Sequence, residues 1–237
     1  MSAVPERCIC CGARTFAQDT VLWPELIEAW ELDAGEAAAI DLQQGWHCTV
    51  CGNNLRAMAL ARAIVRICGG REPLASFVQS HRAHGIRILE INEAGNLTPV
   101  LARMPHHRIV HFPAVSMTAL PFAPGSFDIV CHSDTLEHVE QPVAALRECR
   151  RVLAPGGSVA LTVPIVPGRL TRRRAGLPPS YHGDPSTATA EMLVHTEYGA
   201  DAWLDVIAAG FAECRIIAVA AAHALIGSAG DRWAGEA

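Results

Sequence analysis

The clearest pattern of apolar and polar positions lies between residues 120 and 164, and it predicts three consecutive elements. Residues 127–131 are mostly apolar and contain β-branched side chains, which is typical of a buried parallel strand. After a polar loop at 132–138, apolar residues recur at helical spacing between 142 and 153, and a second apolar strand follows at 158–163. A strand, a crossover helix and a strand form a right-handed unit with parallel strands. We therefore expect an α/β fold, in which ligands bind beyond the carboxyl ends of the strands.

Helical periodicity and turn residues predict the remaining elements. Asp33 and Glu36 form a capping-box-like helix start, and Asn53 or Asn54 caps an alanine-rich helix. Further helices and strands follow from the same patterns. Helices are expected at 24–30, 33–44, 53–68, 74–84, 97–104 and 200–209, and strands at 87–92, 108–112 and 214–221.

The composition suits one sizeable core with a small appendage. The chain has 237 residues, of which 50% are hydrophobic and 18% charged. We divide it into a zinc-binding module at 1–70, a main α/β domain at 71–226 and a frayed tail at 227–237. A net charge of −5 argues against a nucleic-acid partner, and no apolar run suits a membrane span or a signal peptide. A cytoplasmic location is the resulting expectation.

Two Cys-x-x-Cys-Gly pairs mark the N-terminal module. Cys8 and Cys11 form the first pair, and Cys48 and Cys51 form the second. Two such pairs are typical of a tetrahedral, structural Zn²⁺ site, whose four sulfur ligands leave no position for a catalytic water. Cys10 stands outside this spacing. Free structural or redox-active cysteines are the alternative to zinc ligands.

Three tryptophans, Trp23, Trp30 and Trp46, lie between the cysteine pairs in a chain with only 5% aromatic residues. Aromatic side chains bury a large area in small modules, so a local core is the favoured interpretation. A lid over a substrate is the second interpretation.

A signature surrounds the predicted strand–helix–strand unit: Leu-Pro-Phe at 120–122, Ser-Phe-Asp at 126–128, Leu-Glu-His at 136–138, Arg-Val-Leu at 151–153 and Pro-Gly-Gly at 155–157. Over this stretch the chain strongly resembles the class I S-adenosylmethionine-dependent methyltransferases of the type 11-like subgroup. The resemblance implies a doubly wound, Rossmann-like sheet, S-adenosylmethionine as the cofactor and methyl transfer as the activity.

The resemblance also implies which residues face the cofactor. In that family an acidic residue ends the first strand of the main domain and leads into a glycine-rich loop, whereas here only one glycine of that loop remains. The family's ribose and adenine carboxylates are replaced by His111 and Ser116. The candidate cofactor-binding residues are Glu90, Asn92, Gly95, His111, Ser116, Met117, Ser133 and Asp134.

A Pro-, Gly- and Arg-rich segment at 165–189 follows the carboxyl end of a predicted strand and can cover the site. It supplies Tyr181 and His182, which join His138 as candidate catalytic residues, with Asp184 as a further contact. For His138, hydrogen bonding at the helix start is the alternative role. The arginines at 169–174 indicate either an acceptor with an anionic group, such as phosphate or carboxylate, or a solvated loop.

The leading hypothesis is an S-adenosylmethionine-dependent methyltransferase that acts on a small-molecule acceptor. The altered cofactor loop leaves a second hypothesis, a non-catalytic or repurposed member whose cleft holds another ligand. A third is an rRNA or tRNA methyltransferase, because some rRNA methyltransferases place a cysteine zinc module before this fold.

Overall fold

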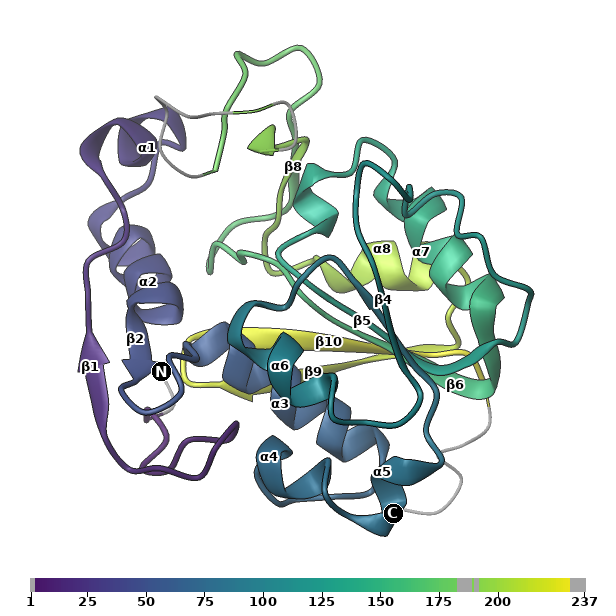
Figure 1. Ribbon diagram of the computed structural model, residues 1–237. Helices are drawn as coiled ribbons and strands as arrows, with labels where there is room; N and C mark the ends of the chain where they lie inside the picture. Colours follow the sequence, from purple (N-terminus) through teal and green to yellow (C-terminus); the bar gives the residue numbers. More distant parts are fainter. Residues whose placement is uncertain (1–2, 183–188, 190–191, 231–237) are drawn as a thin grey trace.

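A six-stranded sheet in the order β4-β3-β5-β6-β10-β9 forms the centre of the molecule (Figure 1). The computed structural model describes residues 3–182, 189 and 192–230. Strands β3 to β6 pair in parallel, and β10 pairs antiparallel with both β6 and β9. The strands are β3 (Ile88–Ile91), β4 (His107–Val110), β5 (Phe127–Ser133), β6 (Leu153–Thr162), β9 (Glu213–Val219) and β10 (Ala222–Ser228). The expected α/β class with a Rossmann-like sheet is confirmed.

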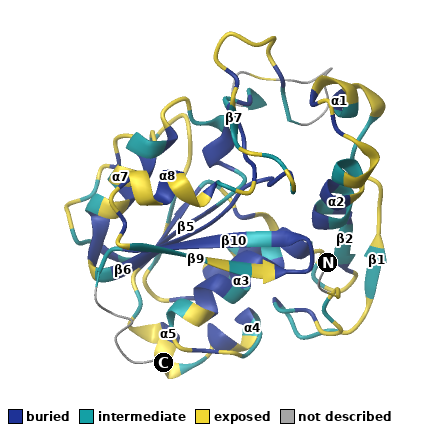
Figure 2. Cartoon of the chain, turned by 180° about the vertical axis from the view of Figure 1, so that it is seen from behind, coloured by how far each residue is buried: buried dark blue, intermediate teal, exposed yellow. Residues whose placement is uncertain are grey.

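Helices cover both faces of this sheet because side chains on each strand alternate between two cores. Ile88 packs with α3 (Leu55–Ile67) in one core, whereas the next residue, Leu89, packs with α7 (Pro142–Val152) in the other. The short helices α4 (Leu74–Phe77), α5 (His81–His84) and α6 (Thr98–Leu101) lie with α3, and α8 (Trp203–Ala208) lies with α7. The inner helix faces are buried and the outer faces of α7 and α8 are exposed (Figure 2).

The expected strand–helix–strand unit corresponds to β5, α7 and β6. Pro142 occupies the first turn of α7, as predicted. The helix ends at Val152, before the Pro-Gly-Gly turn, which lies inside β6. The pairing register between β5 and β6 shifts at this point. Phe127 pairs with Leu153 but Ile129 pairs with Ser158, so the extra residues of the turn form a bulge in β6. The turn is therefore an irregularity of the strand and does not end the helix.

A hairpin and two helices precede the sheet. Strands β1 (Phe16–Gln18) and β2 (Trp46–Cys48) pair antiparallel, and α1 (Pro24–Ala29) and α2 (Ala34–Gly45) lie between them. Asp33 caps α2 through the predicted capping box with Glu36, and Asn54 caps α3. Helix α3, which the sequence analysis assigned to the N-terminal module, packs against β10, β6 and β9 of the main sheet. The boundary at residues 70/71 stays a prediction.

Three expected elements differ from the structure. The helix at 74–84 is divided into α4 and α5, since Ser80 adopts the extended conformation of a helix N-cap and its hydroxyl donates to the carbonyl of Phe77. The helix at 97–104 is a 3₁₀ turn, η1 (Gly95–Leu97), followed by α6. Strand β10 was not predicted, and it contains Gly227 and Ser228 of the expected tail, while 231–237 lie outside the described residues. None of the described helices is long and apolar enough to cross a membrane.

Candidate functional site

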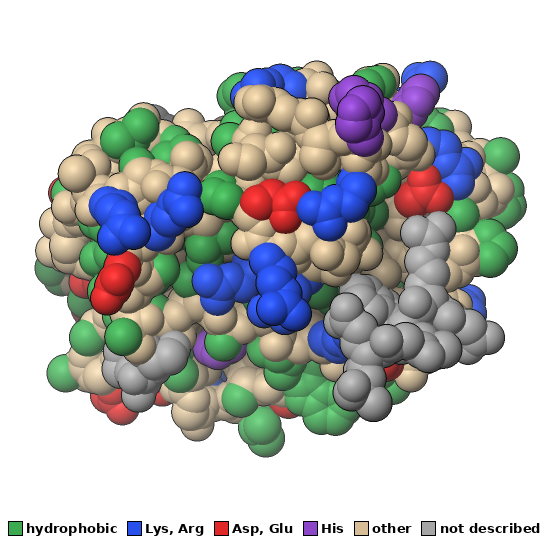
Figure 3. Space-filling view, turned by 90° about the horizontal axis from the view of Figure 1, so that it is seen from below, with side chains coloured by type: hydrophobic (Ala, Val, Ile, Leu, Met, Phe, Trp, Pro, Cys, Tyr) green, Lys and Arg blue, Asp and Glu red, His purple; other side chains and the backbone are tan. Residues whose placement is uncertain are grey.

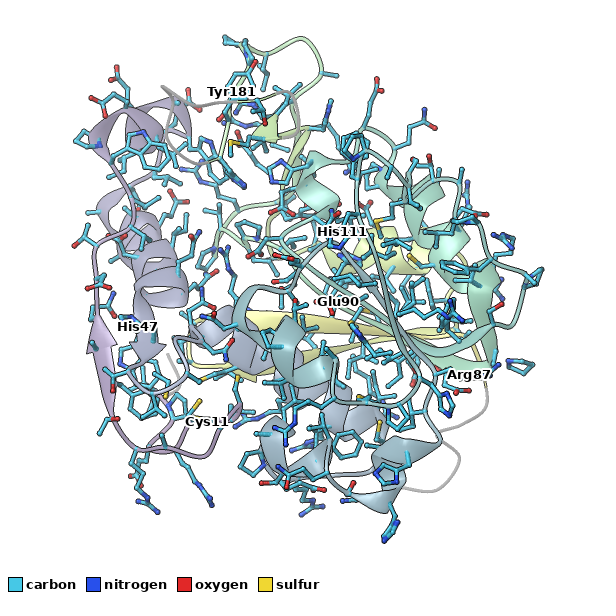
Figure 4. All side chains as sticks on the ribbon, viewed as in Figure 1. Cys11, His47, Arg87, Glu90, His111 and Tyr181 are labelled. Atoms are coloured by element: carbon cyan, nitrogen blue, oxygen red, sulfur yellow. The ribbon has the colours of Figure 1, made fainter. Side chains whose placement is uncertain are left out.

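The two cysteine pairs meet beside the β1–β2 hairpin, where Figure 4 labels Cys11. The Sγ atoms of Cys8 and Cys51 lie 3.6 Å apart, as do those of Cys11 and Cys48, and all four sulfur atoms lie within 4.8 Å of one another. Gly12 and Gly52 adopt positive φ angles of 86° and 69°, so each turn can direct its amide back to the first cysteine's carbonyl. This group can hold one ion in a tetrahedral sulfur site.

A cavity of about 540 Å³, which we call the sheet cavity, opens beyond the carboxyl ends of β3 and β5. Apolar and acidic side chains share its lining, and none of the lining residues is an arginine or a lysine. Its lining comes from the end of β3, the segments at 115–118 and 133–135, and the start of α7, and includes Ile91, Asn92, Glu93, Phe112, Ser116, Met117, Ser133, Asp134, His138, Glu140 and His195. Such a volume is typical of a small-molecule or cofactor site.

Glu90 fixes the loop that follows β3. Its side chain is fully buried, and one carboxylate oxygen accepts hydrogen bonds from the Ala94 amide (2.8 Å) and the Thr98 hydroxyl (2.6 Å). The other oxygen lies 2.7 Å from Nε2 of His107 on β4. Asn92, with a φ of 56°, accepts from the Phe112 amide at 2.9 Å and ties the loop to the end of β4. Two strands thus hold the rim of the sheet cavity.

Arg56 connects α3 to the carboxyl end of β5. Its Nη2 lies 3.2 Å from Oδ2 of Asp134, and only 6% of the arginine side chain is exposed. Nε and Nη1 of Arg56 have no hydrogen-bond partner among the described residues. The side chain of Arg56 therefore lies in the interior and not on a solvated helix face.

A second cavity of about 280 Å³, which we call the tryptophan cavity, adjoins the first. Most of its wall consists of apolar side chains: Val21, Leu22, Trp23, Leu26, Trp30, Ile40 and Pro164. The polar part of the wall consists of Gln44, Arg56, Asp134, His138 and His182. Asp134 and His138 line both cavities. Trp46 instead stacks on Phe16, with ring centroids 4.1 Å apart, so of the three N-terminal tryptophans Trp46 alone lies outside the cavity wall.

Glu137, His138 and His182 gather where the two cavities meet. Nδ1 of His182 lies 3.2 Å from Nε2 of His138, and both nitrogens lie 3.8 Å from Oε1 of Glu137. Glu137 and His138 belong to the 3₁₀ turn η2 (Leu136–His138), whereas His182 comes from the segment after β7 (Arg172–Arg173). Nδ1 of His138 is 3.0 Å from the Leu193 carbonyl, which fixes the orientation of that ring.

Burial controls the protonation of this group. Burial and the nearby charge of Asp134 raise the pKa of Glu137 well above its usual value. Burial, with the charges of His138 and Arg56, lowers the pKa of His182 to about 3. Burial also lowers the pKa of His138. Both imidazoles are therefore neutral near pH 7, and each keeps one nitrogen lone pair available.

The arginine run at 169–174 is paired with carboxylates from other parts of the chain. Arg169 binds Glu36, and Arg173 binds Asp205. Arg172 and Arg174 both bind Glu197 on β8 (Thr196–Glu197). The run therefore attaches this segment to the fold, and neither a free anion-binding cluster nor a solvated loop describes it.

The predicted site residues divide into two groups. Asn92, Ser116, Met117, Ser133 and Asp134 line the sheet cavity, and His138 and His182 meet beside it. The other four do not line either cavity: Glu90 lies behind the loop, Gly95 follows it, His111 is exposed beyond β4, and Tyr181 pairs with Leu193 away from the sheet (Figure 4). Asp184 lies outside the described residues.

Sequence reasoning missed Glu93, Arg56 and His195 as members of the site. Glu93 directly follows Asn92 in the predicted loop, so its carboxylate could have been noted there. Arg56 gave no local signal, because its role depends on burial against a distant segment. Glu137 stands in the Leu-Glu-His motif, but its contact with His182 could not be read from the sequence.

Comparison with known proteins gives a match to the central part of the chain. Residues 51–161 match the family described as "Methyltransferase domain". This segment is similar to a methyltransferase domain and makes up just under half of the chain. The match extends from the second cysteine pair through α3 to the end of β6, and so includes α3 in the family domain.

Two curated relatives match parts of this domain. An uncharacterized methyltransferase of Mycolicibacterium vanbaalenii is 32% identical over 101 residues, which cover 43% of this chain and 40% of that protein. A ubiquinone biosynthesis O-methyltransferase of Pseudomonas paraeruginosa is 46% identical over 39 residues, which cover 16% of this chain and 17% of the relative. The chain thus spans less than half the length of these relatives. Among solved structures, a SAM-dependent methyltransferase of Thermotoga maritima, described as a possible histamine N-methyltransferase, is similar with a TM-score of 0.43 and 15% identity, covering 73% of this chain and 89% of that one.

Proposed function

We propose that the chain binds S-adenosylmethionine in the sheet cavity and methylates a small acceptor held in the tryptophan cavity. The observation that carries the proposal is that the two cavities share Asp134 and His138, so ligands in them would meet at these side chains. When bound, S-adenosylmethionine supplies an electrophilic methyl group on a sulfonium centre. Alignment of the acceptor with that methyl group is the main requirement that such a reaction places on the protein.

The lining of the sheet cavity fits this cofactor. Its apolar wall, with Ile91 and Met117, suits an adenine ring, and its acidic groups, Glu93, Asp134 and Glu140, suit a ligand with positive sulfonium and ammonium groups. Glu93 supplies a carboxylate close to the loop from which the family's glycines are missing. We therefore assign Asn92, Ser116, Met117, Ser133 and Asp134 to cofactor binding.

The tryptophan cavity supports an acceptor with an apolar body and a polar end. Trp23, Leu26 and Trp30 would contact the body, and His138 and His182 would contact the atom that receives the methyl group. The two free nitrogens of Arg56 offer the position for an anionic substituent, because the arginines at 169–174 are already paired. A cavity of about 280 Å³ favours a small molecule over a polynucleotide.

Surface charge also favours a small molecule. On the face shown in Figure 3, basic side chains lie in separate groups with acidic and hydrophobic side chains between them. A protein that follows a phosphate backbone usually presents a continuous basic stripe. We therefore do not propose an rRNA or tRNA acceptor.

We further propose that Cys8, Cys11, Cys48 and Cys51 hold a structural Zn²⁺ ion. Four sulfur atoms within 4.8 Å of one another fill a tetrahedral shell and leave no open position. The group lies in the core that α3 shares with the sheet, so the ion would fix the N-terminal segment to the family domain. This arrangement gives zinc a role in folding and not in the reaction.

Calorimetric titration of the purified chain with S-adenosylmethionine tests the cofactor site. We expect micromolar binding that is at least tenfold weaker in Asp134→Asn, because the variant removes a carboxylate from the cavity, which corresponds to about 1.4 kcal/mol. Asp128→Asn is the matched control: it changes an aspartate at the opposite end of β5, where Asp128 pairs with Arg87. Its affinity for the cofactor should equal that of the wild type. Absence of binding at millimolar ligand would refute the proposal and favour a repurposed member of the family.

A further inference from the structure

We propose that Glu137, His138 and His182 bind a divalent transition-metal ion, distinct from the cysteine site, at the junction of the two cavities. The proposed acceptor would bind this ion through an oxygen atom, a hydroxyl or a carboxylate. The metal site follows from the cluster itself, and only the identity of its exchangeable ligand rests on the proposed function.

The spacing of the three donor atoms matches metal coordination. The separations are 3.2 Å between the two histidine nitrogens and 3.8 Å from each of them to Oε1 of Glu137. A triangle with these sides has corners about 2.1 Å from a common centre, within the range of ~2.0–2.2 Å for bonds from Zn²⁺ to histidine nitrogen or carboxylate oxygen. One ion can therefore reach all three atoms without movement of the side chains.

The carboxylate of Glu137 is buried without a hydrogen bond from the part of the chain that the structure describes. The residue is only 1% exposed, and neither of its oxygens accepts a hydrogen bond from a described residue. Buried carboxylates are normally paired or coordinate a metal. Arg56, which pairs with Asp134 through Nη2, makes no hydrogen bond to Glu137. A divalent cation would provide the missing partner of Glu137.

The histidines are oriented for coordination. The Leu193 carbonyl, 3.0 Å from Nδ1 of His138, accepts the proton of that nitrogen and leaves the Nε2 lone pair directed at the cluster. His182 presents Nδ1 to the same point, and its ring packs 5.3 Å from that of Trp30 at the wall of the tryptophan cavity. The hydrogen bond of His138 to the Leu193 carbonyl is the kind of outer contact that usually orients a histidine ligand of a metal.

Three protein ligands leave coordination positions open. A site with two histidines and one carboxylate suits Fe²⁺, Co²⁺, Ni²⁺ or Zn²⁺, and its open positions accept water or a substrate atom. His138 lines both cavities and His182 lines the tryptophan cavity, so the open side faces the space assigned to the acceptor. The sulfur site, by contrast, uses all four of its positions.

Cobalt substitution distinguishes the two sites in one experiment. The metal-free chain is titrated with Co²⁺ under reducing conditions and followed by absorption spectroscopy. We expect two Co²⁺ ions per chain, of which one shows thiolate-to-cobalt charge transfer and the other only the weak bands of nitrogen and oxygen ligation. Glu137→Gln and His182→Asn should each lose the second ion and retain the thiolate bands, which also report that the cysteine module is folded. His106→Asn, which changes an exposed histidine, should bind two ions like the wild type.

A wild-type chain that binds a single Co²⁺ ion would overturn the proposal, as would a second ion retained in both variants. If Glu137→Gln fails to fold, His182→Asn decides the result, because this side chain is 24% exposed and its loss disturbs the core less. Titration of the same samples with S-adenosylmethionine separates the two proposals. Cofactor binding with one Co²⁺ refutes only the metal site, and two Co²⁺ ions without cofactor binding refute only the methyltransferase assignment.

Discussion

Replacement of Glu90 by alanine tests whether the buried carboxylate holds the cofactor loop. The substitution leaves the Ala94 amide, the Thr98 hydroxyl and His107 without their shared partner in a fully buried position. Removal of one member of a buried charged pair costs about 3–5 kcal/mol, and each hydrogen bond to a charged group contributes about 1.5–3 kcal/mol. Because these contributions overlap, we expect Glu90→Ala to lower the free energy of unfolding by about 3–5 kcal/mol.

Smaller changes at the same place should have graded effects. Glu90→Gln keeps one oxygen acceptor and should cost about 1–2 kcal/mol, and Thr98→Val removes a single hydrogen bond at a similar cost. Urea unfolding with an unchanged m-value measures these differences. The S-adenosylmethionine affinity of Glu90→Gln, measured by calorimetry, should fall at least tenfold, because the loop between Asn92 and Ala94 loses one of its anchors.

The control for Glu90 is Glu72→Ala, which breaks a partly exposed ion pair with Arg82 far from the loop. It should cost less than about 1 kcal/mol and leave cofactor affinity unchanged. The reasoning is refuted if Glu90→Ala destabilises the chain no more than Glu72→Ala. A strongly destabilised Glu90→Ala combined with a normal cofactor affinity in Glu90→Gln would show that the network stabilises the fold but does not position the loop.

Three further predictions concern the tryptophan cavity, the cysteine site and the pH dependence of stability. Leu26→Trp should fill the tryptophan cavity and abolish methylation of any acceptor found by screening, while S-adenosylmethionine affinity stays at the wild-type value; an active variant would place the acceptor elsewhere. Cys11→Ser, or removal of metal by a chelator, should eliminate bound zinc and lower the melting temperature, and equal melting temperatures with and without metal would contradict a structural ion. Burial lowers the pKa of His132 to about 3. Between pH 6.5 and 3 the unfolded chain therefore binds a proton at this residue that the folded chain does not bind. The free energy of unfolding should fall by ~1.4 kcal/mol per pH unit as the pH drops from 6.5 towards 3. His132→Leu should remove that part of the slope in urea unfolding at several pH values, and an unchanged slope would exclude His132 as its source.

Local signals in the sequence predicted the parts of the fold that depend on near neighbours. The capping box of Asp33 and Glu36 and the cap at Asn54 appear as expected, because each needs only residues within one helical turn. Strand β10 was missed, since its sequence of small and apolar residues from Ala222 onwards has no strict alternation and is paired on both sides. Its place between β6 and β9 is a property of the whole sheet.

The candidate site depends even more than the fold on contacts between residues that are distant in the sequence. The spacing within each cysteine pair is local, and the four sulfurs meet as the sequence predicts. His138 and His182 are 44 residues apart, and their contact depends on the path of the segment between β7 and β8, which pair in a separate two-stranded sheet. The arginines at 169–174 gave a misleading signal, because their carboxylate partners lie up to 141 residues away along the chain. Charge patterns identify charged groups but not their distant partners.

Under the proposed function, cofactor and acceptor would be recognised by different parts of the chain. The sheet cavity is built by strands of the central sheet and their loops, whereas most of the apolar lining of the tryptophan cavity comes from residues 21–40. The two parts are joined by a few polar links, including the hydrogen bond from Trp30 to Ser180 (2.8 Å) and that from Gln43 to the Ile165 carbonyl (3.0 Å). Under the proposed function, exchange of this N-terminal stretch alone should change the acceptor preference, which makes it the natural target for directed evolution or for chimeras with related chains.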